Sequence, residues 1–270
     1  MIINHNLNAM NAHRNLAFNN TQQGKSSEKL SSGYRINRAA DDAAGLSISE
    51  KMRAQIKALN QGARNAQDGI SLVQTAEGAM TEVSDMLTRM KELTVQAGNG
   101  TYNASDVAAM SKEYQSLANA ITNIANSTKF NGITLLDGSL ASVTIQLGGT
   151  ASESVIVDFS GINIDASVLG LSSSLSQSSA AAEMAKVDTA IGKVNDYRST
   201  LGAYQNQLEH AYNNIGTTAE NLQSAESRIR DTDMASEMMN YTKFNILQQA
   251  STAMLAQANQ APQGVLQLLR

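Results

Sequence analysis

The strongest constraint on the fold is a series of apolar residues that repeats with helical spacing. From Met52 to Met80 the series has alternating steps of four and three with Glu77 as its one polar member, and it continues less strictly beyond Met80. Such spacing places them on one face of an α-helix. With Asp41 or Asp42 as an acidic start, we expect one helix as far as about residue 97, roughly 80 Å long at 1.5 Å per residue. That length suits a helical rod better than a compact domain.

Two further segments show the same period. One follows a Gly- and Asn-rich turn at 97–106 and extends to about Ile124. The other extends from about Ala180 to Arg230 and keeps its register over about six heptads, which requires a packing partner. We expect that partner to be the helix of 43–97, in antiparallel orientation. The single proline and the 4% aromatic content are typical of long uninterrupted helices rather than of a globular α/β enzyme.

The period changes between the second and third helices. From Phe130 onward, β-branched residues alternate with polar ones, and pairs of glycines interrupt them. This pattern predicts a β-hairpin with strands around Ser142–Leu147 and Ser154–Phe159. A Ser-rich connection at 171–183 then leads into the third helix.

Both ends of the chain are poor in charge. Apart from histidines, Arg14 is the only charged side chain in residues 1–24, and Arg270 is the only one after Phe244. Exposed helices normally carry charges on their wet face, so each end alone would be marginally stable in water. We expect both ends to be loose in the monomer and to become helical in an assembly; the alternative is that they pair and pack on their own rod. The residues expected to pack in that assembly are Ile3, Leu7, Met10, Phe18, Phe244, Leu247, Met254, Leu255, Val265, Leu266, Leu268 and Leu269.

Two short blocks of arginines and aspartates mark the junctions between the charge-poor ends and the charged helices. If the long helices are antiparallel, the two blocks lie side by side. We then expect Arg–Asp pairs across the junction and to neighbouring subunits, with Ala and Gly permitting close backbone approach. The alternative is a set of exposed ion pairs of little energetic weight. The residues concerned are Arg35, Arg38, Asp41, Asp42, Arg228, Arg230, Asp231 and Asp233.

No motif in the sequence supports a catalytic or metal site. The three histidines lie far apart without carboxylates at ligand spacing, and there is no HExxH, Gly-rich phosphate loop or GxSxG. No apolar run is long enough to cross a membrane, and the net charge of −4 gives no reason to expect nucleic acid. We therefore expect no enzyme activity, no cofactor, no nucleic-acid partner and no membrane insertion.

Four segments of the chain closely resemble bacterial flagellin. They are "MIINHNLNAMNAHRNL", "EKLSSGYRINRAADDAAGLSISEKMRAQI", "NAQDGISLVQTAEGAM" and "SRIRDTDMASEMMNYTKFNILQQASTAMLAQANQAPQGVLQLLR". The resemblance covers about 1–140 and 180–270, and the outer, variable domains of longer flagellins are nearly absent. It implies a structural subunit of the secreted, extracellular flagellar filament, exported unfolded by the flagellar type III apparatus and self-assembling into the propeller for swimming. The alternative is a hook–filament junction protein, which shares paired terminal helices.

Together, the residues and the resemblance predict a mainly α fold. It consists of a long antiparallel coiled-coil-like helical rod, a small β-hairpin region, and terminal helices that form a filament core. We expect five parts. They are the N-terminal filament-core helix and junction (1–40), the N-terminal half of the rod (41–140), the hairpin and Ser-rich connection (141–180), the C-terminal rod helix (181–230) and the C-terminal filament-core helix (231–270).

The resemblance also implies partners besides copies of the same chain. These are an export chaperone on the C-terminal segment, the filament cap, the hook-junction proteins and a flagellin-binding assembly factor. A further partner is the flagellin-sensing Toll-like receptor of vertebrates, whose recognition motif resembles "LTRMKELTVQAGNGT" at 87–101, with matching positions Arg89, Leu93 and Glu113. The alternative is that Leu93 lies in the core and Arg89 pairs with Glu92.

Overall fold

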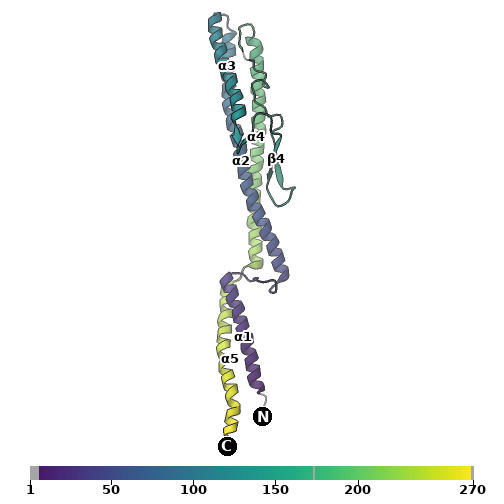
Figure 1. The fold of residues 1–270 in the computed structure, drawn as a ribbon, viewed down its shortest axis with the longest axis vertical. Coiled ribbons are helices and arrows are strands. Elements are labelled where there is room, and N and C mark those ends of the chain that lie inside the picture. The colour runs from purple at the N-terminus through teal and green to yellow at the C-terminus, as the bar shows by residue number, and fades with distance from the viewer. Residues whose placement is uncertain (1–5, 173, 269–270) are drawn as a thin grey trace. The chain divides into compact units, whose positions relative to one another are not determined.

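The computed structural model describes residues 6–172 and 174–268, with side chains described as far as Gln260 (Figure 1). Five α-helices dominate this part of the chain: α1 (Leu7–Ser32), α2 (Ala43–Ala97), α3 (Ala104–Ser127), α4 (Ala180–Arg230) and α5 (Met234–Leu268). Two pairs of short strands lie between α3 and α4: β1 (Lys129–Phe130) with β2 (Ile133–Thr134), and β3 (Ser142–Gln146) with β4 (Ser154–Asp158). The mainly α fold expected from the sequence is confirmed.

The chain divides into two compact units. The terminal unit comprises Met1–Ala54 and Asn221–Arg270, and the central unit comprises Gln55–Glu220. The five parts expected from the sequence concern roles in an assembly and stay a prediction. Two of their boundaries, near residues 40 and 230, fall close to the segments that separate α1 from α2 and α4 from α5.

In the central unit, α2 and α4 lie side by side in antiparallel orientation (Figure 1). The ammonium of Lys91 on α2 is 2.6 Å from a carboxylate oxygen of Asp188 on α4. Further along the pair, the side-chain amide of Gln67 donates to the hydroxyl of Tyr212 at 3.2 Å. From the first contact to the second, the residue number falls along α2 and rises along α4. The expected antiparallel pairing is therefore observed.

The core of the central unit is formed by the same periodic residues that predicted its helices. The spacing brings them onto one face of each helix, and these faces meet. Fully buried members include Val73, Met80, Val83, Leu87 and Met90 from α2, Tyr114 and Ile121 from α3, and Val187, Val194, Leu201 and Leu208 from α4. Two polar residues within the stripes, Glu77 and Arg198, are only half-buried.

The β3–β4 hairpin completes this core. Its strands pair with Val143 opposite Val157 and Ile145 opposite Val155. Each strand ends one residue earlier than predicted. Ile145, Val155 and Val157 are buried. The sequence analysis did not predict β1 and β2, which are joined by Asn131 and Gly132, both with positive φ. An Asn-Gly pair between short β-prone segments is a strong hairpin signal, so this element was detectable.

The hairpin approaches α2 at a glycine. The side-chain amide of Asn65 donates to the carbonyl of Gln146 at 2.8 Å, which holds the end of β3 on the helix. One turn earlier on α2, a Cβ added at Gly62 would overlap the backbone carbonyl of Leu147. The position therefore requires glycine because the backbone of the hairpin occupies the space of a side chain.

We predict that Gly62→Ala lowers the free energy of unfolding by about 1–3 kcal/mol, because the hairpin must move away from α2. The matched control is Gly78→Ala on the same helix, where an added Cβ meets nothing within 4 Å. There the better helix propensity of Ala should raise stability by about 0.4–1 kcal/mol. Urea denaturation followed by circular dichroism measures both variants, and equal effects would contradict the close approach.

Candidate assembly site

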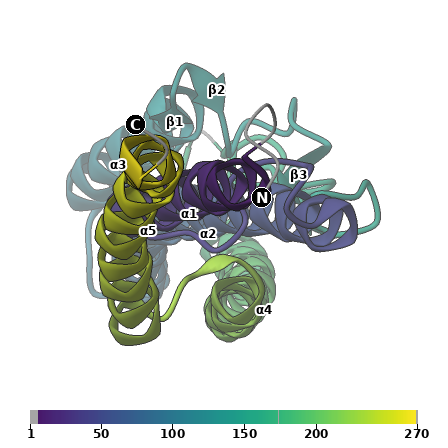
Figure 2. The ribbon, with the colours of Figure 1, turned by 90° about the horizontal axis from the view of Figure 1, so that it is seen from below.

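Helices α1 and α5 lie side by side and antiparallel in the terminal unit (Figure 2). The side-chain amide of Asn6, just before α1, donates to the carbonyl of Ala258 late in α5 at 2.8 Å. Later in α1, the amide of Asn19 donates to the hydroxyl of Ser251 at 2.9 Å and to the carbonyl of Leu247 at 3.4 Å. Asn19 is only 8% exposed, so these bonds join the two helices inside their contact.

The limits of α1 follow from local capping. The side-chain oxygen of Asn6 accepts the backbone N–H of Ala9 at 3.1 Å, which satisfies one of the free donors at the helix start. At the other end, Gly33 adopts a left-handed conformation with φ of 76°, and its N–H donates to the carbonyl of Lys29. Glycine is favoured at such a C-cap because it has no Cβ.

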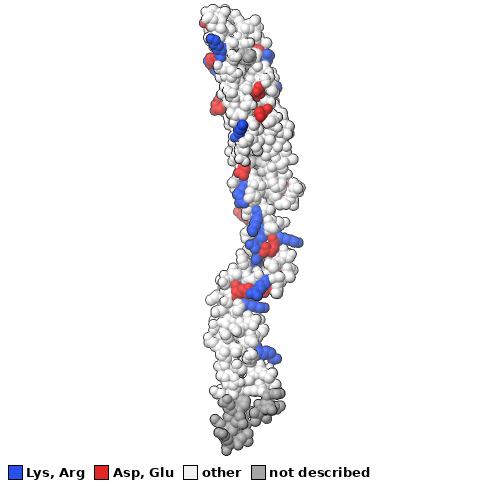
Figure 3. Space-filling view, viewed as in Figure 1, with Lys and Arg blue, Asp and Glu red and all other residues white. Residues whose placement is uncertain are grey.

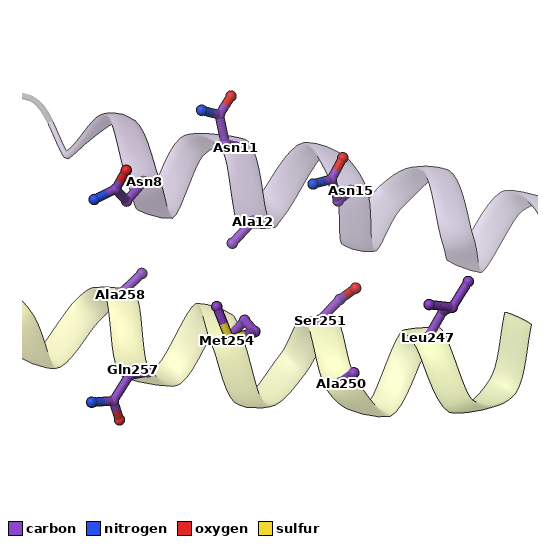
Figure 4. A pocket seen from close by; sticks show the side chains of 10 residues that line it. All are labelled: Asn8, Asn11, Ala12, Asn15, Leu247, Ala250, Ser251, Met254, Gln257 and Ala258. Carbon is purple, nitrogen blue, oxygen red and sulfur yellow. The ribbon is translucent and has the colours of Figure 1, made fainter.

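The sequence-based expectation that the ends are loose in the monomer is not what the structure shows. Both ends are helical in the single chain and pair with each other, which is the first part of the alternative. Two features make the pairing possible. Asparagine amides supply hydrogen bonds across the contact in place of ion pairs, and small residues permit close approach of the helices. Ala12 on α1 and Ala258 on α5 both point into the gap between the helices, whereas Asn11 and Gln257 point away from it (Figure 4).

Although α1 and α5 pair, most of their large apolar side chains stay exposed. Phe18 is 57% exposed, Ile246 60% and Met254 64%. A groove of about 530 Å³ remains between the helices, and Leu247 and Met254 contribute to its wall. Few charged side chains lie over this pair in the view of Figure 3. The surface is therefore both apolar and nearly uncharged, which is unusual for the surface of a soluble monomer.

The predicted packing residues fall into three groups. Leu7, Met10, Phe18, Leu247 and Met254 are exposed, and Phe244 and Leu255 are half-buried. Ile3 and Leu269 lie outside the described residues, as do the side chains of Val265, Leu266 and Leu268. The sequence analysis missed Ile246, which a helical projection of α5 would have detected.

The two junction blocks lie side by side in the terminal unit. The backbone N–H of Arg35 donates to the carbonyl of Arg230 at 2.7 Å, and the N–H of Thr232 donates to the carbonyl of Gly33 at 3.0 Å. Tyr34 and Asp231 form an isolated antiparallel β-bridge between these two bonds. Main-chain pairing therefore joins the two segments.

The arginines of the junction have partners other than the predicted aspartates. Arg38 pairs with Glu28 at 3.0 Å. Arg230 pairs with Glu50, and its guanidinium lies 4.9 Å from the centre of the Tyr34 ring. The hydrogen bond from Arg230 lowers the pKa of the Glu50 carboxyl below its usual value. The other two arginines donate to uncharged oxygens: Arg35 to the carbonyl of Ile229 and Arg228 to the hydroxyl of Ser224.

The junction aspartates bind neighbouring N–H and O–H groups instead. Asp41 accepts the backbone N–H groups of Asn37 and Arg38, and the bond from Arg38 is the main reason that its pKa is lowered. The remaining bonds are from the backbone N–H of Gly45 to Asp42, from the hydroxyl of Ser227 to Asp231, and from the N–H groups of Ala235 and Ser236 to Asp233.

The prediction of Arg–Asp pairs is therefore wrong within the single chain, as far as the eight described junction residues show. Short carboxylates beside helix starts satisfy N–H groups that lack helical partners, and this use competes with pairing to arginine. Pairs to neighbouring subunits stay a prediction. Small residues were expected to permit close approach in this block. Gly45 is such a position, because a Cβ there would meet the side chains of Asp42 and Ile36.

The three predicted receptor-contact positions lie together in the central unit, but they differ in exposure. Arg89 pairs with Glu92 and with Glu113 on α3, both at 2.8 Å, and these bonds raise its pKa, with that to Glu113 contributing most. Leu93 is only 1% exposed and belongs to the core. The core position of Leu93 and the Arg89–Glu92 pair are those of the alternative, because the apolar face of α2 turns Leu93 toward the core.

The described residues contain no group of three or more His, Cys, Asp or Glu side chains arranged to hold a metal ion. None of the described helices combines the length and apolar character that crossing a bilayer requires. The features that remain are the paired terminal helices, the exposed apolar surface on them, and the long helical core of the central unit.

Comparison of the sequence with models of protein families shows the family of the chain. A model of the bacterial flagellin N-terminal helical region matches residues 3–141, and a model of the bacterial flagellin C-terminal helical region matches residues 184–269. The chain belongs to the bacterial flagellin family. The two matched regions contain α1 to α3 and all but the first residues of α4, together with α5.

Relatives extend the match over the whole flagellin chain. It is 53% identical to a flagellin of Halalkalibacterium halodurans and 48% identical to a flagellin of Bacillus subtilis, each alignment covering 100% of both chains. A crystal structure of Bacillus cereus flagellin superposes with a TM-score of 0.51 at 38% identity, over 60% of this chain and 94% of that one. The short form without large variable domains is therefore shared with full-length relatives.

This flagellin is a structural subunit of the bacterial flagellar filament and not an enzyme. Flagellins self-assemble, so its principal partner is another copy of itself. The hook-associated alternative has less support. A putative flagellar hook-associated protein of Vibrio parahaemolyticus superposes with a TM-score of 0.57 over 71% of this chain and 100% of that one, but at only 14% identity, which shows a shared fold alone.

We predict that Asn19→Ala loosens the α1–α5 pair, because it removes the two hydrogen bonds to Ser251 and Leu247. The free energy of local opening should fall by about 1–2 kcal/mol. Asn20→Ala is the matched control, since Asn20 is the next residue on the same helix and is exposed. Hydrogen exchange of α1 and α5 amides in the monomer measures the opening. Equal exchange in the two variants would contradict a role for Asn19 in the pairing.

Proposed function

We propose that the α1–α5 pair is the surface through which this flagellin polymerises. The observation that carries the proposal is the set of large apolar side chains that the pair leaves uncovered, Phe18, Ile246 and Met254 among them. Burying one such side chain contributes about 1.5–3 kcal/mol. Several of them on each chain therefore supply a strong drive toward association with a surface of the same kind.

Neighbouring copies of the same chain are the occupants that this surface suits. The first 24 residues contain one charged side chain besides histidines, and the last 27 contain one. A surface of this composition offers little electrostatic selectivity for a charged partner. The asparagine and glutamine side chains can supply hydrogen bonds between copies, as Asn6 and Asn19 do within one chain.

Export and delivery follow the family pattern in this proposal. The chain leaves the cell unfolded through the flagellar type III apparatus, and the absence of cysteine means that no disulfide opposes unfolding. An export chaperone holds the segment 231–270, where Met239 and Ile246 are 68% and 60% exposed. The cap, the hook-junction proteins and the flagellin-binding assembly factor are the other proposed partners.

We predict that the double variant Phe18→Gln, Ile246→Gln polymerises poorly while the monomer stays folded. Both side chains are exposed, so unfolding of the monomer should change by no more than about 0.5 kcal/mol. The protein concentration needed for seeded growth should rise at least about tenfold, which corresponds to about 1.4 kcal/mol. Sedimentation and electron microscopy measure the growth.

The control for this double variant is Ile156→Gln on β4. Ile156 is 56% exposed but belongs to the central unit, on β4 and not on α1 or α5. This variant should polymerise as the unaltered chain does. If the double variant and the control grew at the same protein concentration, the α1–α5 pair would not be the assembly surface.

We also propose that the exposed ion-pair cluster of Arg89, Glu92 and Glu113 contacts the flagellin-sensing Toll-like receptor of vertebrates. The family motif at 87–101 supports this proposal, and the guanidinium of Arg89 is half-exposed at the surface of α2. Leu93 acts indirectly here, because it is buried beneath the cluster and keeps α2 packed.

We predict that Arg89→Ala lowers receptor activation by at least about tenfold, as expected for an arginine at the centre of an interface. Arg53→Ala is the matched control, because Arg53 also forms an exposed pair with a glutamate three residues away. Leu93→Ala would be ambiguous, since removing a buried leucine costs about 2–5 kcal/mol of stability. A cell-based receptor assay with folded monomers measures the effect. Equal activation by the Arg89 and Arg53 variants would refute this contact.

A further inference from the structure

The methionines differ in exposure according to the part of the chain in which they lie. Among the described residues, five are largely exposed, and all five are on α1 or α5: Met10 (64%), Met234 (48%), Met238 (50%), Met239 (68%) and Met254 (64%). In the central unit, Met80 and Met90 are fully buried, and Met86, Met110 and Met184 are half-buried. The apolar surface described above is therefore rich in accessible thioethers.

The rest of the composition makes these thioethers chemically distinctive. The chain contains no cysteine and no tryptophan. Methionine is thus the side chain of this protein most open to two-electron oxidation by a peroxide. In that reaction the sulfur attacks one oxygen of hydrogen peroxide, the O–O bond breaks and a sulfur–oxygen bond forms. The sulfur loses two electrons, the peroxide is reduced, and water leaves after proton transfer.

We propose that the five exposed methionines make the α1–α5 surface oxidation-sensitive. Hydrogen peroxide converts them to sulfoxides in the unassembled chain, and the oxidised chain no longer polymerises. Once the chain is in a filament, neighbouring copies cover these side chains and protect them. This inference rests on the proposed role of the α1–α5 pair in polymerisation and adds a chemical modification that controls it.

The physical reason lies in the change of polarity. A thioether is flexible and apolar and fills irregular gaps between packed helices. A sulfoxide is polar and chiral, and its oxygen needs a hydrogen-bond donor when it is buried. The surface around these residues has few charged donors, and a sulfoxide oxygen would compete for the asparagine amides, such as those of Asn6 and Asn19, that already bond across the helix pair.

Two positions illustrate how oxidation would act. Met254 lies on the side of α5 that faces α1, opposite Ala12 (Figure 4). A sulfoxide there would disturb both the groove and the surface that a neighbouring copy covers. Met239 is the most exposed of the five and lies in the first two turns of α5, close to the junction.

The first experiment compares oxidation rates in monomers and filaments of the full chain. Both are treated with dilute hydrogen peroxide, and the sulfoxide at each methionine is measured by peptide mass spectrometry. In the monomer, the five exposed methionines should oxidise at least about tenfold faster than Met80 and Met90. In the filament, their rates should fall at least about tenfold. Equal rates in monomer and filament would overturn the proposed protection.

The second experiment measures assembly after oxidation. Peroxide-treated monomers should need at least about tenfold more protein for seeded growth, or about 1.4 kcal/mol. A variant with leucine at all five positions should grow equally well with and without treatment. The control variant Met80→Leu, Met90→Leu should stay as sensitive as the unaltered chain. If the five-leucine variant fails to assemble, the test is to treat the oxidised native chain with methionine sulfoxide reductases. This reduction should restore growth.

The outcomes separate this inference from the proposed function. Normal growth of chains that carry sulfoxides at all five positions would overturn the inference and leave the assembly role of α1 and α5 intact. Growth that reductases do not restore would also overturn it, because the damage would then lie elsewhere. Undiminished growth of the Phe18→Gln, Ile246→Gln variant, by contrast, would overturn the proposed assembly surface itself.

Discussion

The exposed apolar surface of this flagellin arises from a geometric limit of its terminal helices. Two helices in contact bury only the stripe along which they meet, and a helix with apolar residues outside that stripe leaves them in water. Helices α1 and α5 are such helices, since Phe18 and Ile246 stay more than half exposed after pairing. Their contact relies on asparagine amides and small residues, which contribute specificity but bury little apolar area. Association with further copies is the way to cover the remainder.

The central unit shows the opposite situation. Faces of α2, α3 and α4 meet together with the β3–β4 hairpin, so the large apolar side chains of one chain cover one another. Val73, Met80 and Leu201 have no exposed surface. This unit has a complete core without a partner, whereas the terminal unit does not. The contrast explains why most of the exposed large apolar side chains lie on α1 and α5.

Between α1 and α2, and between α4 and α5, the two connecting segments are held by main-chain bonds rather than by the ion pairs that their composition predicts. The bridge of Tyr34 to Asp231 joins the segments, and the guanidinium of Arg230 lies over the ring of Tyr34. The aspartates satisfy N–H and O–H groups within a few residues of their own positions. The local bonds use aspartate side chains, whereas the two segments are joined by main-chain groups and arginine side chains. The same residue, such as Asp231, can therefore take part in both.

The sequence by itself determined the helices, the β3–β4 hairpin and the family, because periodicity, capping and turn chemistry act between residues a few positions apart. Only the tertiary structure decided that the ends pair, that Leu93 is buried, and that Arg230 selects Glu50, a residue 180 positions away. Composition places arginines and carboxylates in the same block, but it cannot rank partners whose distances depend on how whole helices pack. The physical reason is that the free energy of an ion pair or of burial depends on three-dimensional separation, which the local pattern does not contain.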